Sequence, residues 1–244
     1  MYYYRKGDRW FASLTLPSVE HADEDGVVAV GGDYEVSCFI DAYRRGIFPW
    51  PFGEGSDFLL PWCSPDPRFV LYPDAVHVSH SLRKVLKRSR FEVRADSQFE
   101  SVIRHCASVC RREEGTWITE GMIEVFCALH RLGLAHSVES YLDGELVGGF
   151  YGMCLGRIFC GESMFTLVSD ATKVAFVTFC RRASAYGIRL IDCQCYTENM
   201  ARYGAHEMAR SEFLAQLSRH RDEAVPVELW CGDWGRESWC GGED

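Results

Sequence analysis

Two apolar, strand-like segments each carry a carboxylate at a position where a core residue would normally stand. Residues 157–165 include Glu162, and residues 188–195 include Asp192 and Gln194. Burying an unpaired carboxylate is costly, so a buried one is either partnered or kept for chemistry. A carboxylate near a reacting centre can hold an amine or receive its proton, directly or through an amide such as that of Gln194. These three side chains are the strongest candidates for the chemistry of the protein.

Strand geometry predicts how these groups are presented. Alternate side chains of a strand share one face of its sheet. In the first segment, one face is therefore expected to carry Ile158, Cys160, Glu162 and Met164. In the second segment, one face is expected to carry Leu190, Asp192 and Gln194.

The elements around these strands predict a mixed α+β fold. Asp143-Gly144 is a strong hairpin signal between two strand-like segments. The expected order is strands at 135–142, 145–153 and 157–165, a helix at 169–186, a strand at 188–195 and a helix at 211–220. Such a mixed, mainly antiparallel sheet with an intervening helix is similar to the order in GNAT-type acyltransferases.

Changes in composition along the chain predict three parts. Residues 1–75 are rich in turn formers and are expected to form a small N-terminal α+β domain. Residues 76–222 form the GNAT-like domain, which opens with helices expected at 79–90, 97–112 and 119–132. Residues 223–244 are an acidic, Trp-rich tail, and the sequence leaves open whether its tryptophans dock on the body.

The composition excludes several classes of protein. The 244 residues are 47% hydrophobic, which is enough for a well-packed core. No run of 18 apolar residues occurs, so no membrane span is expected, and the first residues hold no apolar signal-peptide core, so a cytoplasmic location is expected. The 12 cysteines lack the spacing of a structural zinc site, and reduced thiols are expected.

Charge is distributed unevenly along this chain, whose net charge is −9. Residues 77–112 hold nine Lys or Arg against three acids, whereas residues 222–244 hold seven acids against one Arg. Four basic residues recur at i, i+1, i+4 and i+5 and so share one helix face: Arg83, Lys84, Lys87 and Arg88. This face is either a phosphate-binding surface or an ordinary solvated helix face.

Nine short motifs follow one another along the chain. They are Ala29-Val-Gly-Gly-Asp33, Ala42-Tyr-Arg-Arg-Gly-Ile-Phe-Pro-Trp50, Trp62-Cys-Ser-Pro-Asp-Pro-Arg68, His77-Val-Ser-His-Ser-Leu-Arg-Lys84, Gly115-Thr-Trp-Ile-Thr119, Ala135-His-Ser-Val-Glu139, Leu146-Val-Gly-Gly-Phe-Tyr-Gly152, Gly161-Glu-Ser-Met-Phe165 and Leu190-Ile-Asp-Cys-Gln194. In these motifs and in their order the sequence resembles the leucyl/phenylalanyl-tRNA–protein transferases, over roughly residues 27–217.

The resemblance implies an activity and its partners. The enzyme would take Leu or Phe, and in some cases Met, from an aminoacyl-tRNA and join it to the N-terminus of a protein that begins with Arg or Lys. The product would be degraded by the bacterial N-degron pathway. An aminoacyl ester is already activated, and orientation alone can supply about 7–11 kcal/mol of the barrier. No metal, nucleotide cofactor or membrane is expected.

The resemblance also implies roles for particular residues. It gives Asp192 and Gln194 a hydrogen-bonding role toward the attacking amine and places Glu162 near the aminoacyl group; whether Asp192 takes the proton itself or orients the network stays open. The aminoacyl pocket is expected to include Met153, Phe159, Met164, Phe165, Phe179 and Ile191. The terminal adenosine of the tRNA is expected to stack on Trp50 and Trp117, although each could instead be a core Trp. The phosphates of the tRNA are assigned to Arg83, Lys84, Lys87 and Arg88.

Three positions depart from the pattern of the family. The family commonly has Arg, Trp and His where this chain has His80, Cys63 and Asn199. These changes surround the candidate site and concern tRNA affinity and acceptor preference more than the reaction. Two rival hypotheses are an acyl-CoA N-acyltransferase of the GNAT type, which would need a pyrophosphate-binding turn before residue 170, and a tRNA-binding protein without catalysis.

Overall fold

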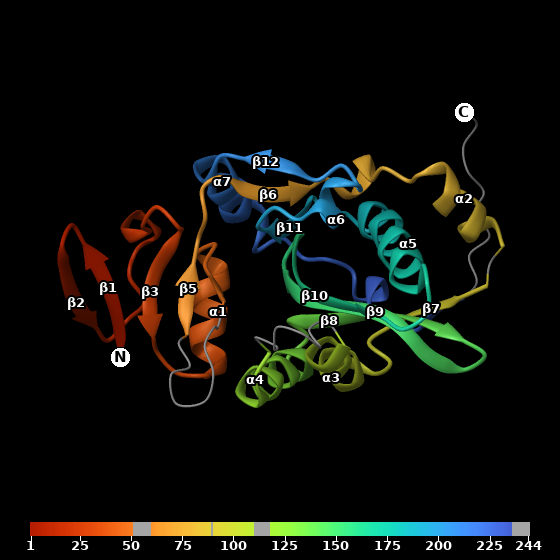
Figure 1. Cartoon of the computed structure of the whole chain (residues 1–244), viewed down its shortest axis with the longest axis horizontal. Coiled ribbons are helices and arrows are strands. Elements are labelled where there is room, and N and C mark those ends of the chain that lie inside the picture. The colour runs from red at the N-terminus through yellow and green to blue at the C-terminus, as the bar shows by residue number, and fades with distance from the viewer. Residues whose placement is uncertain (51–59, 89, 110–117, 236–244) are drawn as a thin grey trace.

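The computed structural model describes residues 1–50, 60–88, 90–109 and 118–235, which form two β-sheets with flanking helices (Figure 1). The smaller sheet lies at the N-terminal end of the molecule and the larger one forms its centre. Within these ranges no helix combines the length and the apolar character needed to cross a bilayer. The prediction of an α+β fold with a mixed, mainly antiparallel sheet is confirmed.

The N-terminal sheet has the strand order β2-β1-β3-β5-β4. Its strands are β1 (Tyr2–Lys6), β2 (Arg9–Ser13), β3 (Val27–Gly31), β4 (Phe48–Pro49) and β5 (Pro61–Cys63). Helix α1 (Val36–Arg44) follows β3. Its buried residues Phe39, Ala42 and Tyr43 face the rest of the protein.

The central sheet has the strand order β12-β6-β11-β10-β9-β8-β7-β13. Its strands are β6 (Arg68–Leu71), β7 (Glu92–Ala95), β8 (Ala135–Leu142), β9 (Glu145–Leu155), β10 (Ile158–Thr166), β11 (Leu190–Gln194), β12 (His206–Met208) and β13 (Asp233–Gly235). Among the described strands, only β10 and β11 pair in parallel. Asp143 and Gly144 both have positive φ in the β8–β9 turn, which explains why this hairpin signal was reliable.

Helices cover both faces of the central sheet (Figure 1). One face packs against α3 (Phe99–Val109) and α4 (Glu120–Arg131), and the other against α2 (His80–Lys87) and α5 (Ala171–Ala185). Two further helices follow β11, namely α6 (Glu198–Ala201) and α7 (Arg210–His220). The side chains of Ser79 and Thr119 accept the backbone N–H of Leu82 and Met122, which fixes the starts of α2 and α4.

The two sheets share a hydrophobic core. Apolar side chains of the N-terminal sheet and α1 join those of α3 and α4 in one continuous cluster. Strand β6 lies within the predicted N-terminal part but pairs in the central sheet. The division of the chain at residues 75 and 222 stays a prediction.

The described part of the C-terminal tail packs on the body. β13 pairs with β7 at the edge of the central sheet. The indole of Trp230 stacks on the ring of His136 at 3.9 Å and lies 5.8 Å from the rings of Phe159 and Phe179. The tail up to residue 235 therefore completes the aromatic core on the α5 side; Trp239 lies outside the described residues.

Candidate active site

The candidate site lies where the parallel strands β10 and β11 separate. They pair from Ile158 opposite Leu190 to Cys160 opposite Asp192. Beyond that point β10 continues along β9, while β11 ends at Gln194. Side chains just past the last pair can therefore face each other across the opening.

A β-bulge in β10 sets the direction of Glu162. The register of β10 on β9 shifts between Gly161 and Ser163. Before the bulge Cys160 packs in the core on the α3 side, and after it Met164 packs on the α5 side, because the extra residue reverses the alternation. The expectation of one shared face was therefore wrong for Ile158, Cys160, Glu162 and Met164.

A second bulge shapes the end of β11. Its register on β6 shifts between Asp192 and Gln194, and Gln194 has φ 63°, an uncommon left-handed conformation for a residue other than Gly. The backbone N–H of Gln194 donates to Asp192 Oδ1 at 2.9 Å. Asp192 thus holds the backbone conformation that directs the Gln194 side chain toward β10.

Asp192 itself is bound by Arg68 in a buried, bidentate ion pair. Arg68 Nε donates to Oδ1 at 2.8 Å and Nη2 donates to Oδ2 at 2.7 Å, and both side chains are 1% exposed. The guanidinium also lies over the rings of Phe48 and Phe213, at 4.6 and 4.5 Å from their centroids. Since both carboxylate oxygens already accept hydrogen bonds, Asp192 is held as a charged, oriented group.

Glu162 is the second carboxylate and lies in a different environment. Its Oε1 accepts hydrogen bonds from the Tyr43 hydroxyl at 2.7 Å and from Gln194 Nε2 at 2.8 Å. Burial raises the pKa of Glu162 to about 8, against the hydrogen bond from Tyr43, and the nearby negative charge of Asp192 raises it further. A carboxyl with such a pKa can both accept and release a proton near neutral pH.

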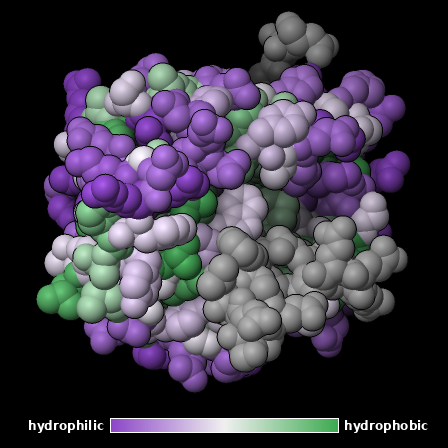
Figure 2. Space-filling view, turned by 60° about the vertical axis from the view of Figure 1, so that its left-hand side comes forward, coloured by the Kyte–Doolittle hydropathy of each residue, from purple (hydrophilic) through white to green (hydrophobic). Residues whose placement is uncertain are grey.

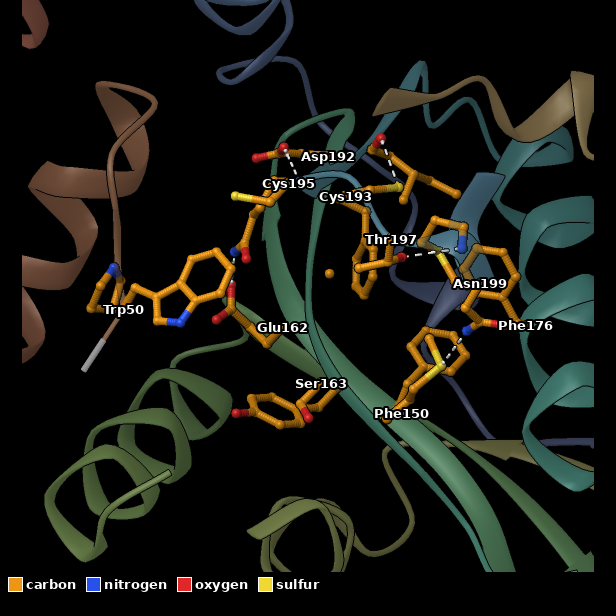
Figure 3. A pocket seen from close by; sticks show the side chains of 18 residues that line it. Trp50, Phe150, Glu162, Ser163, Phe176, Asp192, Cys193, Cys195, Thr197 and Asn199 are labelled. Atoms are coloured by element: carbon orange, nitrogen blue, oxygen red, sulfur yellow. Dashed lines mark hydrogen bonds between the residues drawn. The ribbon is translucent and has the colours of Figure 1, made fainter. Parts of the chain in front are cut away.

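These groups border a cavity of about 600 Å³. Its lining includes the side chains shown in Figure 3, in which Trp50 and Cys195 lie at one side, Phe150 and Phe176 at the other, and Glu162 points toward Trp50. The apolar lining residues on the α5 side are Phe150, Phe159, Met164, Phe176, Ile191 and Met200. In the space-filling view, apolar side chains are recessed at the middle of the face, beneath a band of hydrophilic ones (Figure 2). A mostly apolar cavity with a few polar groups is typical of a site for a small apolar group.

The structure brings together six of the nine predicted catalytic and pocket residues. Glu162, Asp192 and Gln194 line the cavity, as do three of the six predicted pocket residues: Phe159, Met164 and Ile191. Phe179 lies behind the lining, 4.7 Å from the Phe159 ring. The expectation for Met153 and Phe165 requires correction, because both pack in the core on the α3 side and Phe165 stacks on His105.

The predicted tRNA contacts that the structure describes lie in two separate places. Trp50 lines the cavity and is 40% exposed, so it is not an ordinary core Trp. Trp117 lies outside the described residues. The four basic residues are exposed on α2, which Figure 1 shows beyond α5, at the opposite end of the molecule from the N-terminal sheet: Arg83, Lys84, Lys87 and Arg88.

Sequence reasoning assigned no role to two residues that hold the site. Arg68 and Tyr43 both lie inside the recognised motifs, but neither was linked to a carboxylate. A lone Arg at the start of a buried strand, as in Arg68-Phe-Val-Leu71, indicates a buried anion and was the available signal for the first. The contact of Tyr43 with Glu162 spans 119 residues and left no local signal.

One group of metal-ligand residue types lies outside the cavity. Ligand atoms of Asp96, His130 and His136 lie within 4.8 Å of one another. His136 Nδ1 is 2.7 Å from Asp96 Oδ2, His130 Nδ1 is 2.8 Å from the Ala135 carbonyl oxygen, and Asp96 Oδ1 accepts the Ser137 N–H at 2.9 Å. These atoms are already hydrogen-bonded within the protein, which fits a structural network between α4 and β8.

Comparison with known proteins identifies the family. Residues 70–218 match the family model described as leucyl/phenylalanyl-tRNA protein transferase. A solved structure of a functionally unknown conserved protein from Staphylococcus epidermidis is similar at a TM-score of 0.41 and 13% identity, over 59% of this chain and 57% of that one.

Several relatives carry the name leucyl/phenylalanyl-tRNA–protein transferase. The protein of Myxococcus xanthus is 52% identical over 216 residues, which cover 88% of this chain and 91% of that protein. The protein of Laribacter hongkongensis is 48% identical over 88% of this chain and 92% of its own length. The protein of Nitrosospira multiformis is 48% identical over 92% of this chain and 97% of its own length. The chain therefore belongs to the leucyl/phenylalanyl-tRNA–protein transferase family, whose reaction moves an aminoacyl group from tRNA to the N-terminus of a protein.

Proposed function

We propose that the enzyme transfers Leu, Phe and, with lower efficiency, Met from tRNA to proteins that begin with Arg or Lys, in the cytoplasm. The apolar cavity supports this donor choice. A hydrophobic pocket discriminates a single methylene by only about 1–3 kcal/mol, so unbranched Met should be tolerated beside Leu. The role in the N-degron pathway follows from the family.

The observation that carries the proposal is the Glu162–Gln194 pair at the edge of the apolar cavity. The aminoacyl side chain would occupy the cavity, with the ester carbonyl near this pair. Trp50 would stack on the terminal adenine, an interaction that contributes about 1–3 kcal/mol per base. Trp117 is proposed as its partner from the family motif alone.

Glu162 is the proposed proton acceptor. In its ionised form it would take a proton from the acceptor α-amine as the nitrogen attacks the ester carbonyl. The C–N bond forms, the ester C–O bond breaks, and the ribose oxygen leaves with a proton. The reference pKa of an α-amine is near 8, close to that of Glu162, which favours ready transfer between them. Glu162 Oε1 accepts from Tyr43 and Gln194, and we assign Oε2, which takes part in neither bond, to the amine.

Asp192 is the proposed positioning residue. Its oxygens are bound by Arg68 and by the Gln194 backbone, so its charge orients Gln194 rather than receiving the proton. Gln194 in turn holds Glu162 at Oε1. The chain of contacts thus runs from Arg68 through Asp192 and Gln194 to the proton acceptor.

The exposed basic face of α2 is the proposed surface for tRNA phosphates. The buried residues of this helix are Leu82 and Leu86, which leaves the opposite side to its basic residues. Lys and Arg bind phosphates through charge, without reading the sequence. With the acceptor end in the cavity, the backbone of the tRNA would extend toward α2.

A transfer assay tests the function. Purified protein, Phe-tRNA and a peptide that begins with Arg should yield a peptide extended by Phe at its N-terminus, as measured by mass spectrometry. The same peptide with an acetylated N-terminus should give no product, and peptides beginning with Asp or Glu should react far more slowly than those beginning with Arg or Lys. Tight binding of Phe-tRNA without any extended peptide, or efficient acetyl transfer from acetyl-CoA, would overturn the proposal.

A further inference from the structure

A second, smaller cavity adjoins the candidate active site. Its volume is about 230 Å³, and it shares Trp50 and Cys195 with the larger cavity. In Figure 3 these two side chains lie on the same side of the larger cavity, the side toward which Glu162 points. Among the described residues, those that line it are Asp25, Val27, Trp50, Pro61, Cys63, Pro65 and Cys195. The second cavity therefore lies directly beside the region assigned to the attacking amine.

The second cavity combines apolar walls with a carboxylate. Its described lining consists of an indole, two prolines, a valine, two thiols and the acidic side chain of Asp25. One of the thiols belongs to Cys63, the position at which the resemblance led us to expect a larger Trp. A smaller side chain at this point leaves room beside Trp50.

Asp25 is presented to this space by a fixed turn. Asp23 Oδ1 accepts the backbone N–H groups of Asp25 at 3.1 Å and of Val27 at 2.8 Å, which occupies Asp23 in the turn. The Asp25 side chain is exposed and makes no hydrogen bond or ion pair with the residues that the structure describes. Its negative charge is thus available to a ligand and would repel a phosphate group.

The ligand that fits this lining is a long side chain with an apolar stem and a cationic end. Lys and Arg have this form, and their methylene stems bury along apolar surfaces while the charge stays in contact with water or an anion. A guanidinium or ammonium near the indole of Trp50 would also gain a cation–π contact. The charge of Asp25 provides the matching anion.

From the shared wall of the two cavities we infer that the smaller one binds the side chain of the acceptor's N-terminal residue and that Asp25 selects a basic one. This inference rests on the proposed acceptor class. When the α-amine of that residue lies at Glu162, its side chain leaves the same α-carbon beside Trp50 and Cys195 and enters the second cavity. Asp25 is then a specificity residue that contacts the substrate away from the reacting atoms.

Two peptides that differ only in charge test the inference. One begins with Arg and the other with citrulline, which has nearly the shape of Arg but is neutral. The wild-type enzyme should transfer Phe to the Arg peptide with a kcat/KM about two to five times that for the citrulline peptide, since an exposed ion pair has a modest strength. Asp25→Asn should raise KM for the Arg peptide by about the same factor and leave the citrulline peptide unchanged.

Charge reversal and a matched control sharpen the test. Asp25→Lys should lower transfer to the Arg peptide further and raise transfer to a peptide that begins with Glu. Glu24→Gln is the control, because Glu24 is exposed, adjacent in sequence and outside the linings of both cavities. The dissociation constant for Phe-tRNA should be the same in all of these proteins, which reports intact folding and donor binding.

The outcomes separate this inference from the proposed function. If the wild-type enzyme transfers Phe to the Arg peptide but Asp25→Asn keeps the full preference for Arg over citrulline, the second cavity is not the acceptor subsite while the function stands. An equal effect of Glu24→Gln would reduce the role of Asp25 to general surface charge and overturn its assignment. Failure of the wild-type enzyme to extend any peptide would instead reject the function on which the inference rests.

Discussion

The Gln194 amide donates to Glu162 Oε1 at 2.8 Å, across the opening between two strands that pair in parallel only as far as Cys160 and Asp192. The contact places the proposed proton acceptor from β10 beside an amide from β11 at the edge of one cavity. Because the backbone of Gln194 is in turn bound by Asp192, the proposed roles of the two carboxylates differ: Glu162 accepts the proton and Asp192 orients the amide.

Replacing Glu162 by Gln removes the proton acceptor while keeping the size of the side chain. We expect kcat for Phe transfer to fall by about 100-fold, in the range of general acid–base contributions, with little change in the dissociation constant for Phe-tRNA. Single-turnover transfer and filter binding measure the two quantities. Glu145→Gln, an exposed change at the start of β9, serves as control. Parallel losses of transfer and of binding would show that Glu162 only shapes the cavity.

Activity should depend on pH through Glu162. The proposed acceptor works in its ionised form, so kcat/KM should rise as pH increases through about 8, the pKa to which burial raises this carboxyl. The acceptor α-amine titrates in the same range, so the wild type and Glu162→Gln must be compared with the same peptide. The part of the rise that belongs to Glu162 should be missing from the variant. Identical pH profiles would contradict the assignment.

The same raised pKa predicts a pH-dependent stability. Between the ordinary value of 4.5 and about 8, native Glu162 retains a proton that the unfolded chain has lost. Its contribution to the free energy of unfolding is therefore fully present below about pH 4.5 and is lost as pH rises through about 8. Urea unfolding of the wild type and of Glu162→Gln at pH 6 and pH 9 should show the larger decrease in the wild type. A constant difference between them would rule out this linkage.

Asp192→Asn should destabilise the protein strongly because it leaves the Arg68 guanidinium buried without its partner. Breaking a buried pair in this way costs about 3–5 kcal/mol. The exposed pair of Arg104 and Glu120 provides a matched comparison, since its shortest contact is 2.9 Å but its side chains are 48% and 61% exposed. Glu120→Gln should lower the free energy of unfolding by less than about 1 kcal/mol. If denaturant unfolding showed the same loss of stability for both substitutions, burial would not determine the contribution of the Arg68–Asp192 pair to stability.

Lys84→Ala combined with Lys87→Ala should weaken tRNA binding and its salt dependence. Each phosphate contact adds about 0.9 to the slope of log K against log salt on a duplex, so the double change should lower the slope by nearly two. Arg104→Ala is the control, because its guanidinium already pairs with Glu100 and Glu120. An unchanged slope in the double variant would remove α2 from the tRNA-binding surface.

The sequence was informative where local patterns decide the structure. Asp143-Gly144 predicted its hairpin because both residues tolerate positive φ, and helix α3 followed from the helical spacing of its apolar residues. The sequence was uninformative where a β-bulge adds one residue to a strand and so changes the alternation of its side chains. The bulge at Gly161 reverses the alternation in β10, which is why Phe165 left the expected pocket and packs against His105.

Long-range partners were the other limit. The pairing of Arg68 with Asp192 joins residues 124 apart, and that of Tyr43 with Glu162 joins residues 119 apart. Alternation could show that a carboxylate stood in a buried strand, but not which group compensated it. The assignment of Asp192 to positioning and of Glu162 to proton transfer therefore depended on the spatial structure.

The position of Arg68 also bears on how the molecule can move. Besides Asp192, Arg68 donates to the Gly46 carbonyl oxygen at 3.2 Å and lies over Phe48, so it fastens the segment after α1 to the end of β11. Arg68 and Asp192 lie on neighbouring strands of the central sheet, so a hinge motion that swung the N-terminal sheet away would leave their ion pair intact. It would instead break the hydrogen bond from the buried guanidinium to Gly46 and remove the Phe48 ring from it, at a cost of about 1.5–3 kcal/mol for the hydrogen bond. We therefore expect substrates to enter and products to leave without separation of the two sheets.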